Sequence, residues 1–434
     1  MTIKISHFKN KKIVSIDMKK LYLQLILLAM TLSAFAQNTI IETIKSKELS
    51  GELNNERVLK IYVPESYKQD STRVYPLAII LDAEYLFDIY VANSKMFAMN
   101  DLAPEQIVVG VYQNQKNERQ TDCEVDVNGR LTETSSKFMH FIQNELISHI
   151  ESKYRISPFK TIVGNTITAN FINYFLLEQE PVFNAYININ PSYSTDIADL
   201  FRGRIPSIDK NIYYYLNNGD YNGKQKNKVI ETNYYVLKNF ENENFQYKYD
   251  VFNGSTKISS IGQAIPGALA YIFDMYSPIS KEEFDEHIAQ LSPAEAIEYL
   301  EKKYVEIQYL FGSNLKIRQR DIFAIESIVL DKEDGDYLEE FGKMINRLYP
   351  ESPIGDYYIG QYYETSNDLK RALKYYKNGF AKISSDDPNS DGYYQNVERV
   401  LAKQKSIKGD YQDEEPEMDP ADDTGSASSS GEGL

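Results

Sequence analysis

The strongest constraint on the fold is a series of short apolar runs that alternates with helical patterns between residues 57 and 278. Residues 77–81 and 106–111 are nearly continuous apolar runs, which is the pattern of strands buried on both faces. Further strands are predicted at residues 57–64, 161–163, 185–189, 212–216 and 245–252, and helices at residues 136–154, 169–177 and 262–276. This alternation predicts an α/β fold with a mostly parallel sheet and helices on both faces.

The pattern changes after Ser277, and the chain beyond it is predicted to be helical. Ser292 and Glu295 bracket a helix start as an N-cap and its capping-box partner. Residues 353–386 resemble a tetratricopeptide repeat of about 34 residues that lacks the tryptophan. Residues at repeat-like positions are Ile359, Gly360, Tyr363, Ala372, Tyr376 and Gly379, with a weaker copy through Val329, Leu338, Ile345 and Pro350. A generic helical hairpin is the alternative interpretation.

The two ends of the chain differ from the rest. Residues 1–36, with a possible true start at Met18, have the basic start, apolar stretch and A-x-A site of a secretory signal peptide. A membrane anchor is the alternative, but the apolar run is shorter than the ~20 residues that a span needs. Residues 409–434 carry nine acidic and no basic side chains and are predicted to be disordered. The remaining domains are predicted at 37–278 and 279–408.

Composition excludes several classes of function. The chain has 47 Lys and Arg against 63 Asp and Glu, so nucleic acid is not expected as a partner. Its one cysteine, Cys123, cannot form an internal disulfide and is interpreted as an ordinary thiol. We find no zinc-ligand spacing and no phosphate-binding glycine loop, and therefore expect no metal and no cofactor.

Several separated motifs in residues 57–278 resemble one family. They are "RVLKIYVPESY", "YPLAIILDAEYLF" with Asp82 and Glu84, "PEQIVVGVYQNQKNERQTD" with Arg119 and Asp122, and the segment that runs from "FMHFIQNEL" into "FKTIVGNT". Together they resemble the esterase family of the α/β-hydrolase fold, which includes enterochelin esterases and S-formylglutathione hydrolases. The resemblance implies an α/β-hydrolase sandwich and an acyl-transfer triad in the order serine, acid, histidine.

The triad positions that this resemblance implies hold unsuitable residues. Thr166 takes the nucleophile position after Gly164, and Thr168 takes the place of a small residue. Asp220 is the candidate acid, and Lys257 stands where the family has its histidine. A lysine is a poor general base near neutral pH unless it is strongly desolvated. The chain's four histidines are His7, His140, His149 and His287, and none follows the last predicted strand at the expected place.

These residues favour a catalytically inactive esterase-like protein that is exported to the periplasm and acts as a binding or scaffold subunit. We expect protein partners, bound through the helical part, and no nucleic acid. The composition, with 35 tyrosines and no tryptophan, resembles that of envelope proteins of Bacteroidota, which makes an outer-membrane complex a candidate. Two alternatives stay open: an active acyl hydrolase with an atypical nucleophile, and a pseudoesterase that binds a small ligand.

Overall fold

The computed structural model describes residues 39–46, 56–113, 118–194, 196–312, 315–330, 335–384 and 387–410. The predicted signal peptide and all of the predicted acidic tail except its first two residues lie outside these ranges. The chain divides into two compact units. The first contains the described residues up to Ser277 and a short segment from Gln308, and the second contains Pro278–Ile307 and the described residues from Leu315 onward.

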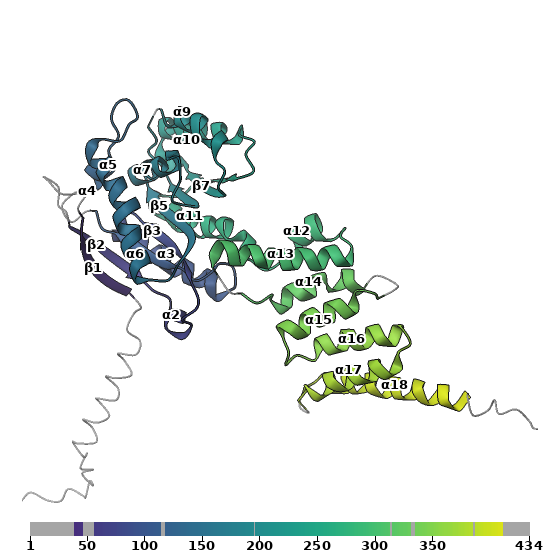
Figure 1. Ribbon diagram of the computed structural model, residues 1–434. Coiled ribbons are helices and arrows are strands. Elements are labelled where there is room, and N and C mark those ends of the chain that lie inside the picture. Colours follow the sequence, from purple (N-terminus) through teal and green to yellow (C-terminus); the bar gives the residue numbers. More distant parts are fainter. Residues whose placement is uncertain are drawn as a thin grey trace, which may run out of the picture. The chain divides into compact units, whose positions relative to one another are not determined.

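The first unit is built on an eight-stranded sheet in the order β1-β2-β4-β3-β5-β6-β7-β8 (Figure 1). The strands are β1 (Thr39–Lys45), β2 (Glu56–Tyr62), β3 (Tyr75–Ile80), β4 (Ile107–Val111), β5 (Ile156–Asn165), β6 (Ala185–Ile189), β7 (Ile212–Asn218) and β8 (Phe245–Val251). From β4 to β8 all neighbours are parallel, whereas β1 and β2 are antiparallel. The predicted α/β class and its mostly parallel sheet are therefore confirmed.

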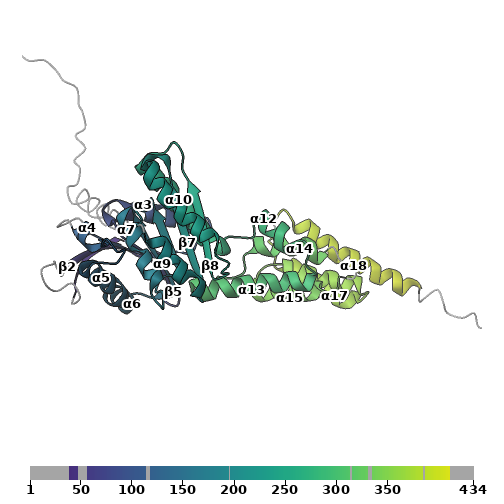
Figure 2. The same cartoon turned by 90° about the horizontal axis from the view of Figure 1, so that it is seen from above.

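Burial along the central strands explains their sequences. Every residue of β3, β4, β6 and β7 is buried, as their continuous apolar runs predict. Helices α3 (Ala83–Met99) and α11 (Lys257–Ile272) pack together. A large core joins the strands to α5, α8, α9 and α10, whose bounds are given below, and Figure 2 shows the chain from above.

The other helices of this unit are short, apart from α10. Their bounds are α2 (Ser66–Gln69), α4 (Glu118–Asp122), α5 (Glu133–His140), α6 (Ile147–Lys153), α7 (Ile167–Phe171), α8 (Asn173–Leu177), α9 (Ile197–Arg204) and α10 (Lys224–Lys238). The helix predicted at 136–154 exists, but a π-helical turn at Phe141–Leu146 interrupts it between α5 and α6. 3₁₀ turns occur at Ile205–Ser207, Asp220–Asn222 and Asp274–Tyr276.

The second unit is helical throughout its described residues. It contains α12 (Lys281–Glu283), a π-helical turn at Phe284–Ile288, α13 (Pro293–Phe311, whose last residues belong to the first unit), α14 (Gln319–Leu330), α15 (Leu338–Leu348), α16 (Ile354–Thr365), α17 (Leu369–Ala381) and α18 (Ser390–Asp410). The predicted capping box is present, because the amide of Ser292 donates to Glu295 Oε2 over 2.8 Å. Of the repeat-like positions, Ala372 is fully buried and Gly360 faces the ring of Tyr376, where a Cβ would lie 2.7 Å away. Searching the helices of the described ranges for a membrane span finds none of sufficient length and apolarity.

Candidate functional site at the elbow after β5

The chain turns sharply between β5 and α7 at Thr166. This residue has a φ of 59° and a ψ of −107°, a conformation that β-branched residues rarely adopt. The turn is held from both sides, since Thr166 N donates to Ile189 O and Thr166 O accepts from Ser192 N, each over 2.9 Å. Gly164 lets the helix approach the strand, because a Cβ there would lie 2.6 Å from backbone atoms of Thr168 and Ala169. The predicted strand, bend and helix are therefore present, with the strained backbone of a nucleophile elbow.

A buried carboxylate fixes the elbow to β3. Asp82, at the start of α3, is fully buried and its Oδ2 accepts from Thr168 Oγ1 over 2.7 Å. The same hydroxyl accepts from the amide of Asn165 over 2.7 Å. Thr168 is fully buried, and its hydroxyl joins the elbow to Asp82, which a small residue without a hydroxyl could not do.

Arg119 completes the network and reaches the nucleophile position. Its guanidinium pairs with Asp82 through Nε and through Nη2, the latter over 3.1 Å. Nη2 also donates to Asn165 O over 2.9 Å and to Thr166 Oγ1 over 3.0 Å. The hydrogen bond and charge of Asp82 raise the pKa of Arg119, against the opposing effect of burial, so the group stays a cation. The hydroxyl at the nucleophile position therefore accepts a hydrogen bond from a permanent cation.

A second buried ion pair is formed by Arg57 and Asp122. Arg57 Nη2 donates to Asp122 Oδ1 over 2.8 Å, and both side chains are almost completely buried. Burial raises the pKa of Asp122 to about 6, although Arg57 opposes the change. Burial also raises the pKa of the neighbouring Cys123 thiol, so this cysteine is held as an unreactive thiol. Gln113 joins the two charge groups, because its Oε1 accepts from the backbone amide of Asp82 over 3.4 Å and its Nε2 donates to Asp122 Oδ2 over 3.3 Å.

The candidate acid and the residue at the histidine position occupy neighbouring segments. Asp220 lies in the turn after β7, and its Oδ2 accepts from the amide of Gly254 over 3.1 Å. Lys257 is the first residue of α11, directly after the N-cap Thr256, and is exposed. Within the part of the chain that the structure describes, no hydrogen bond or ion pair joins Thr166 to either residue.

None of the histidines that the structure describes forms a hydrogen bond or ion pair with Thr166. His149 on α6 pairs with Glu42 of β1 over 2.8 Å. His140 is exposed at the end of α5. His287 belongs to the second unit, where it is exposed near Glu286. His7 lies outside the described residues.

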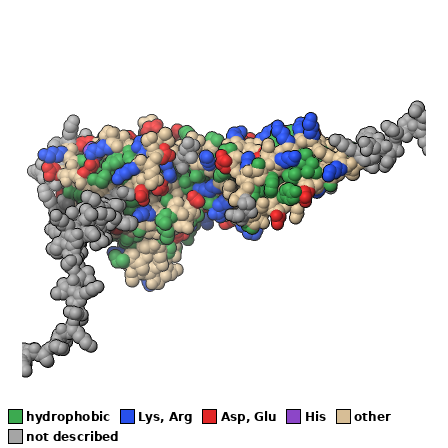
Figure 3. Space-filling model, turned by 90° about the horizontal axis from the view of Figure 1, so that it is seen from below, with side chains coloured by type: hydrophobic (Ala, Val, Ile, Leu, Met, Phe, Trp, Pro, Cys, Tyr) green, Lys and Arg blue, Asp and Glu red, His purple; other side chains and the backbone are tan. Residues whose placement is uncertain are grey.

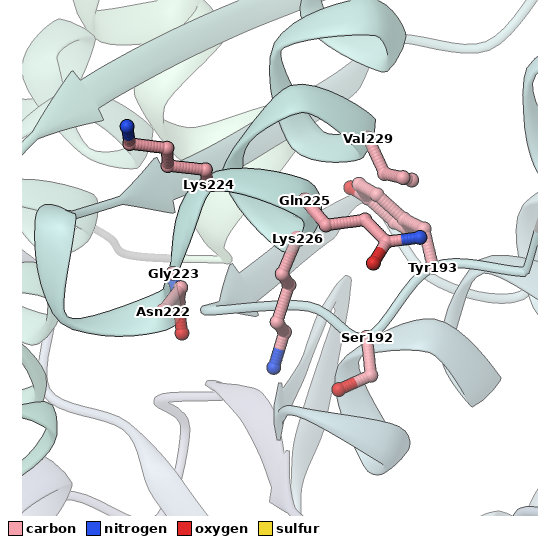
Figure 4. Close-up of a pocket in the computed structure, with 8 residues that line it drawn as sticks. All are labelled: Ser192, Tyr193, Asn222, Gly223, Lys224, Gln225, Lys226 and Val229. Carbon is pink, nitrogen blue, oxygen red and sulfur yellow. The ribbon is translucent and has the colours of Figure 1, made fainter.

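Sequence reasoning missed a pocket beside the elbow. A cavity of about 500 Å³ is lined by residues that follow β6 and by the start of α10, namely Ser192, Tyr193, Asn222, Gly223, Lys224, Gln225, Lys226 and Val229 (Figure 4). Burial and the nearby charge of Lys257 lower the pKa of Lys226 to about 8. A second cavity of about 340 Å³ shares Ser192 and is also lined by Ile167 and Asn170 of α7. The segment "NGDYNGKQK" is typical of a turn, and its sequence alone does not indicate that the side chain of Lys226 lines a pocket.

Asparagine and tyrosine side chains fill the space between the ends of β6 and β7. Asn190 has a φ of 48°, accepts at Oδ1 from Asn217 Nδ2 over 3.0 Å and from the Tyr221 hydroxyl, and donates to Ser260 Oγ over 3.0 Å. This neutral network joins the ends of β6 and β7 to α11 through Ser260. A search of the described side chains finds no cluster of His, Cys, Asp or Glu that could hold a metal.

Fold and elbow together define the class of the first unit. A mostly parallel sheet with a strained turn after its central strand is the α/β-hydrolase fold. Residues 50–170, which end just past the elbow, match the model of the putative esterase family. No match to a curated protein was found.

The solved structures that are similar to the chain include two bacterial proteins. An uncharacterised protein from Capnocytophaga ochracea is 26% identical with a TM-score of 0.73, and the match covers 84% of this chain and 99% of that one. An IroE-like serine hydrolase from Shewanella oneidensis is 18% identical with a TM-score of 0.53, over 71% of this chain and 98% of that one. The second likeness supports the fold alone. The family and fold that the sequence motifs implied are therefore confirmed.

Proposed function

We propose that the chain is an esterase-fold binding protein that does not hydrolyse esters at its elbow. The observation that carries this proposal is the contact of Thr166 Oγ1 with Arg119. A hydroxyl nucleophile needs a base that accepts its proton, and a guanidinium can only donate. Asp82 pairs with Arg119 and holds it at this position. Lys257 at the histidine position and the neutral Asn190 network provide no replacement base.

An acyl hydrolase with Thr166 as nucleophile is the second candidate. Lys226 favours it, because an amine with a pKa of about 8 is partly neutral near physiological pH and could accept a proton. A base must come within hydrogen-bond reach of the hydroxyl. No hydrogen bond joins Lys226 to Thr166 in the described structure, and the elbow hydroxyl has Arg119 as its partner. We therefore favour the binding protein.

Covalent labelling distinguishes the two candidates. A fluorophosphonate probe reacts with activated hydroxyl nucleophiles in hydrolases, and the full chain should remain unlabelled after prolonged incubation. A serine esterase in the same tube controls for probe quality. Labelling of the wild type that disappears in Thr166→Ala would refute the proposal, and labelling that disappears in Lys226→Gln as well would establish the Thr-Lys hydrolase.

We further propose that the protein is exported and binds protein partners through its second unit. The signal-like residues 1–36 support export, and consecutive helix pairs such as α16 with α17 support partner binding, because stacked helix pairs offer extended concave surfaces. Phe323 on α14 is 43% exposed and Tyr394 on α18 is 47% exposed. Crosslinking and purification from intact envelopes should recover partners, and the double variant Phe323→Ser and Tyr394→Ser should recover fewer. Recovery of the chain alone from the cytoplasm would refute both parts.

A further inference from the structure

The pocket beside the elbow contains a lysine that lacks an internal counter-charge. Lys226 is half-buried, and its ammonium extends toward the space that the Ser192 hydroxyl also faces (Figure 4). No ion pair or hydrogen bond of Lys226 is found among the described residues. The other charge that acts on it is that of Lys257, which repels it. The chain is acidic, yet it holds Lys226 near Lys257 without giving Lys226 a carboxylate partner. This arrangement costs free energy unless an anion binds to Lys226.

The rest of the pocket indicates what accompanies the anion. Tyr193 and Val229 provide an aromatic ring and an aliphatic side chain on one side, while Gln225 adds a neutral amide. The volume of about 500 Å³ lies within the usual range for small-molecule sites, about 300–1,000 Å³. The start of α10 adds to the positive potential, because its first turn contains no acidic residue and its N-cap, Gly223, has no side chain.

We propose that this pocket binds a small organic carboxylate, with the carboxylate at Lys226 and Ser192 and the organic part against Tyr193 and Val229. The inference rests on the proposed function, since the bound species is the charged acid and not an ester to be cleaved. Ser192 connects this site to the elbow, because its backbone amide donates to Thr166 O. A bound carboxylate therefore lies next to the turn that a hydrolase would use for catalysis.

A matched pair of lysines makes the proposal testable. Lys224 stands two residues before Lys226 on α10, but its side chain points away from Lys226 and Ser192 (Figure 4). Lys224→Gln and Lys226→Gln remove the same charge from the same helix turn. Neither lysine has a salt bridge or hydrogen bond in the described residues, so neither substitution removes a stabilising internal contact. The unfolding temperature of Lys224→Gln should equal that of the wild type within error, whereas that of Lys226→Gln should be at least as high as the wild type's, because the substitution removes the repulsion from Lys257.

The experiment is a calorimetric titration of the full chain with sodium benzoate at constant ionic strength. Benzoate should bind the wild type, Lys226→Gln should weaken binding about tenfold or more, and Lys224→Gln should change it less than about twofold. Methyl benzoate, which lacks the charge, and inorganic phosphate, which lacks the organic part, should both bind more weakly than benzoate. Absence of benzoate binding, equal losses in both lysine variants, or equal binding of the ester or of phosphate would overturn the inference.

The same samples separate this inference from the proposed function. Proton NMR of the methyl benzoate arm detects any conversion to benzoate. Conversion that depends on Thr166 would refute the binding-protein proposal, while the benzoate arm would still report on the carboxylate site. Failure of benzoate to bind, without any conversion of the ester, would refute the site and leave the proposed function standing.

Discussion

Replacing Thr168 with valine should destabilise the first unit far more than the same change at Thr166. At Thr168 the substitution keeps the shape but removes a hydroxyl that donates to the buried Asp82 and accepts from the amide of Asn165. The amide then lacks its partner in a buried place, which costs about 1–3 kcal/mol, and the loss of a hydrogen bond to a carboxylate costs about 1.5–3 kcal/mol. Since Asp82 keeps Arg119 as a partner, we expect a total near 3 kcal/mol.

Thr166→Val is the matched control for this change. Valine is also β-branched, so the strain of a φ of 59° is the same before and after the substitution. The half-buried hydroxyl of Thr166 loses one bond from Arg119, which keeps Asn165 O and Asp82 as acceptors. The expected loss is below about 1 kcal/mol.

Hydrogen exchange measured against urea concentration is the suitable assay, because peptides from β5 and α7 report the opening of this unit alone. The free energy of opening should fall about 3 kcal/mol for Thr168→Val and less than about 1 kcal/mol for Thr166→Val. Equal losses in the two variants would refute the claim that Thr168, and not Thr166, holds the elbow.

Three further predictions concern other parts of the molecule. Glu364 accepts from Arg399, Lys403 and Tyr376, and these bonds lower its pKa to about 2. A carboxylate whose pKa is lowered by folding stabilises the fold at pH values above its unfolded pKa, near 4.3, and this stabilisation is lost as the pH falls towards 2. Glu364→Gln should therefore destabilise the second unit by about 1–2 kcal/mol at pH 7 and by almost nothing at pH 2. Hydrogen exchange of α16 and α18 measures both values. Benzoate binding should weaken as pH rises through about 8, where Lys226 loses its proton, and Lys226→Gln should abolish this dependence in calorimetry; a pH profile that survives the substitution would contradict the assignment. Thr166→Ser should create no esterase activity, because no base is added and Arg119 still donates to the hydroxyl; turnover of p-nitrophenyl acetate by this variant above the wild-type rate would contradict the prediction.

The sequence predicted the sheet well because burial on both faces leaves a direct signature. Runs such as those in β3 and β4 admit almost no polar residue, so strand positions can be read from single segments. The missed strand β1 lies at the sheet edge with only one partner strand and has no buried residue, which leaves a weaker pattern in the sequence. The π-helical turn after α5 was also missed, since its apolar spacing differs little from that of an α-helix.

The site was predictable only where family motifs marked it. The spacing of Gly164 and Thr166 predicted the elbow, and the family motif that follows residue 111 marked Arg119 and Asp122 as site residues. The contact of Arg119 with Thr166 depends on side chains 47 positions apart, and no local pattern encodes it. Lys226 was missed for a similar reason, because its inward direction follows from the packing of α10 against the residues after β6.

The central claim is that the elbow survives as architecture without a working nucleophile. Hydrolysis of p-nitrophenyl acetate and butyrate by wild type and Thr166→Ala, at high protein concentration and with a denatured sample as blank, tests it most directly. We predict that wild type and variant release p-nitrophenol at the same slow rate, set by surface side chains that any folded protein exposes. Turnover by the wild type that saturates with substrate and is lost in Thr166→Ala would contradict the claim.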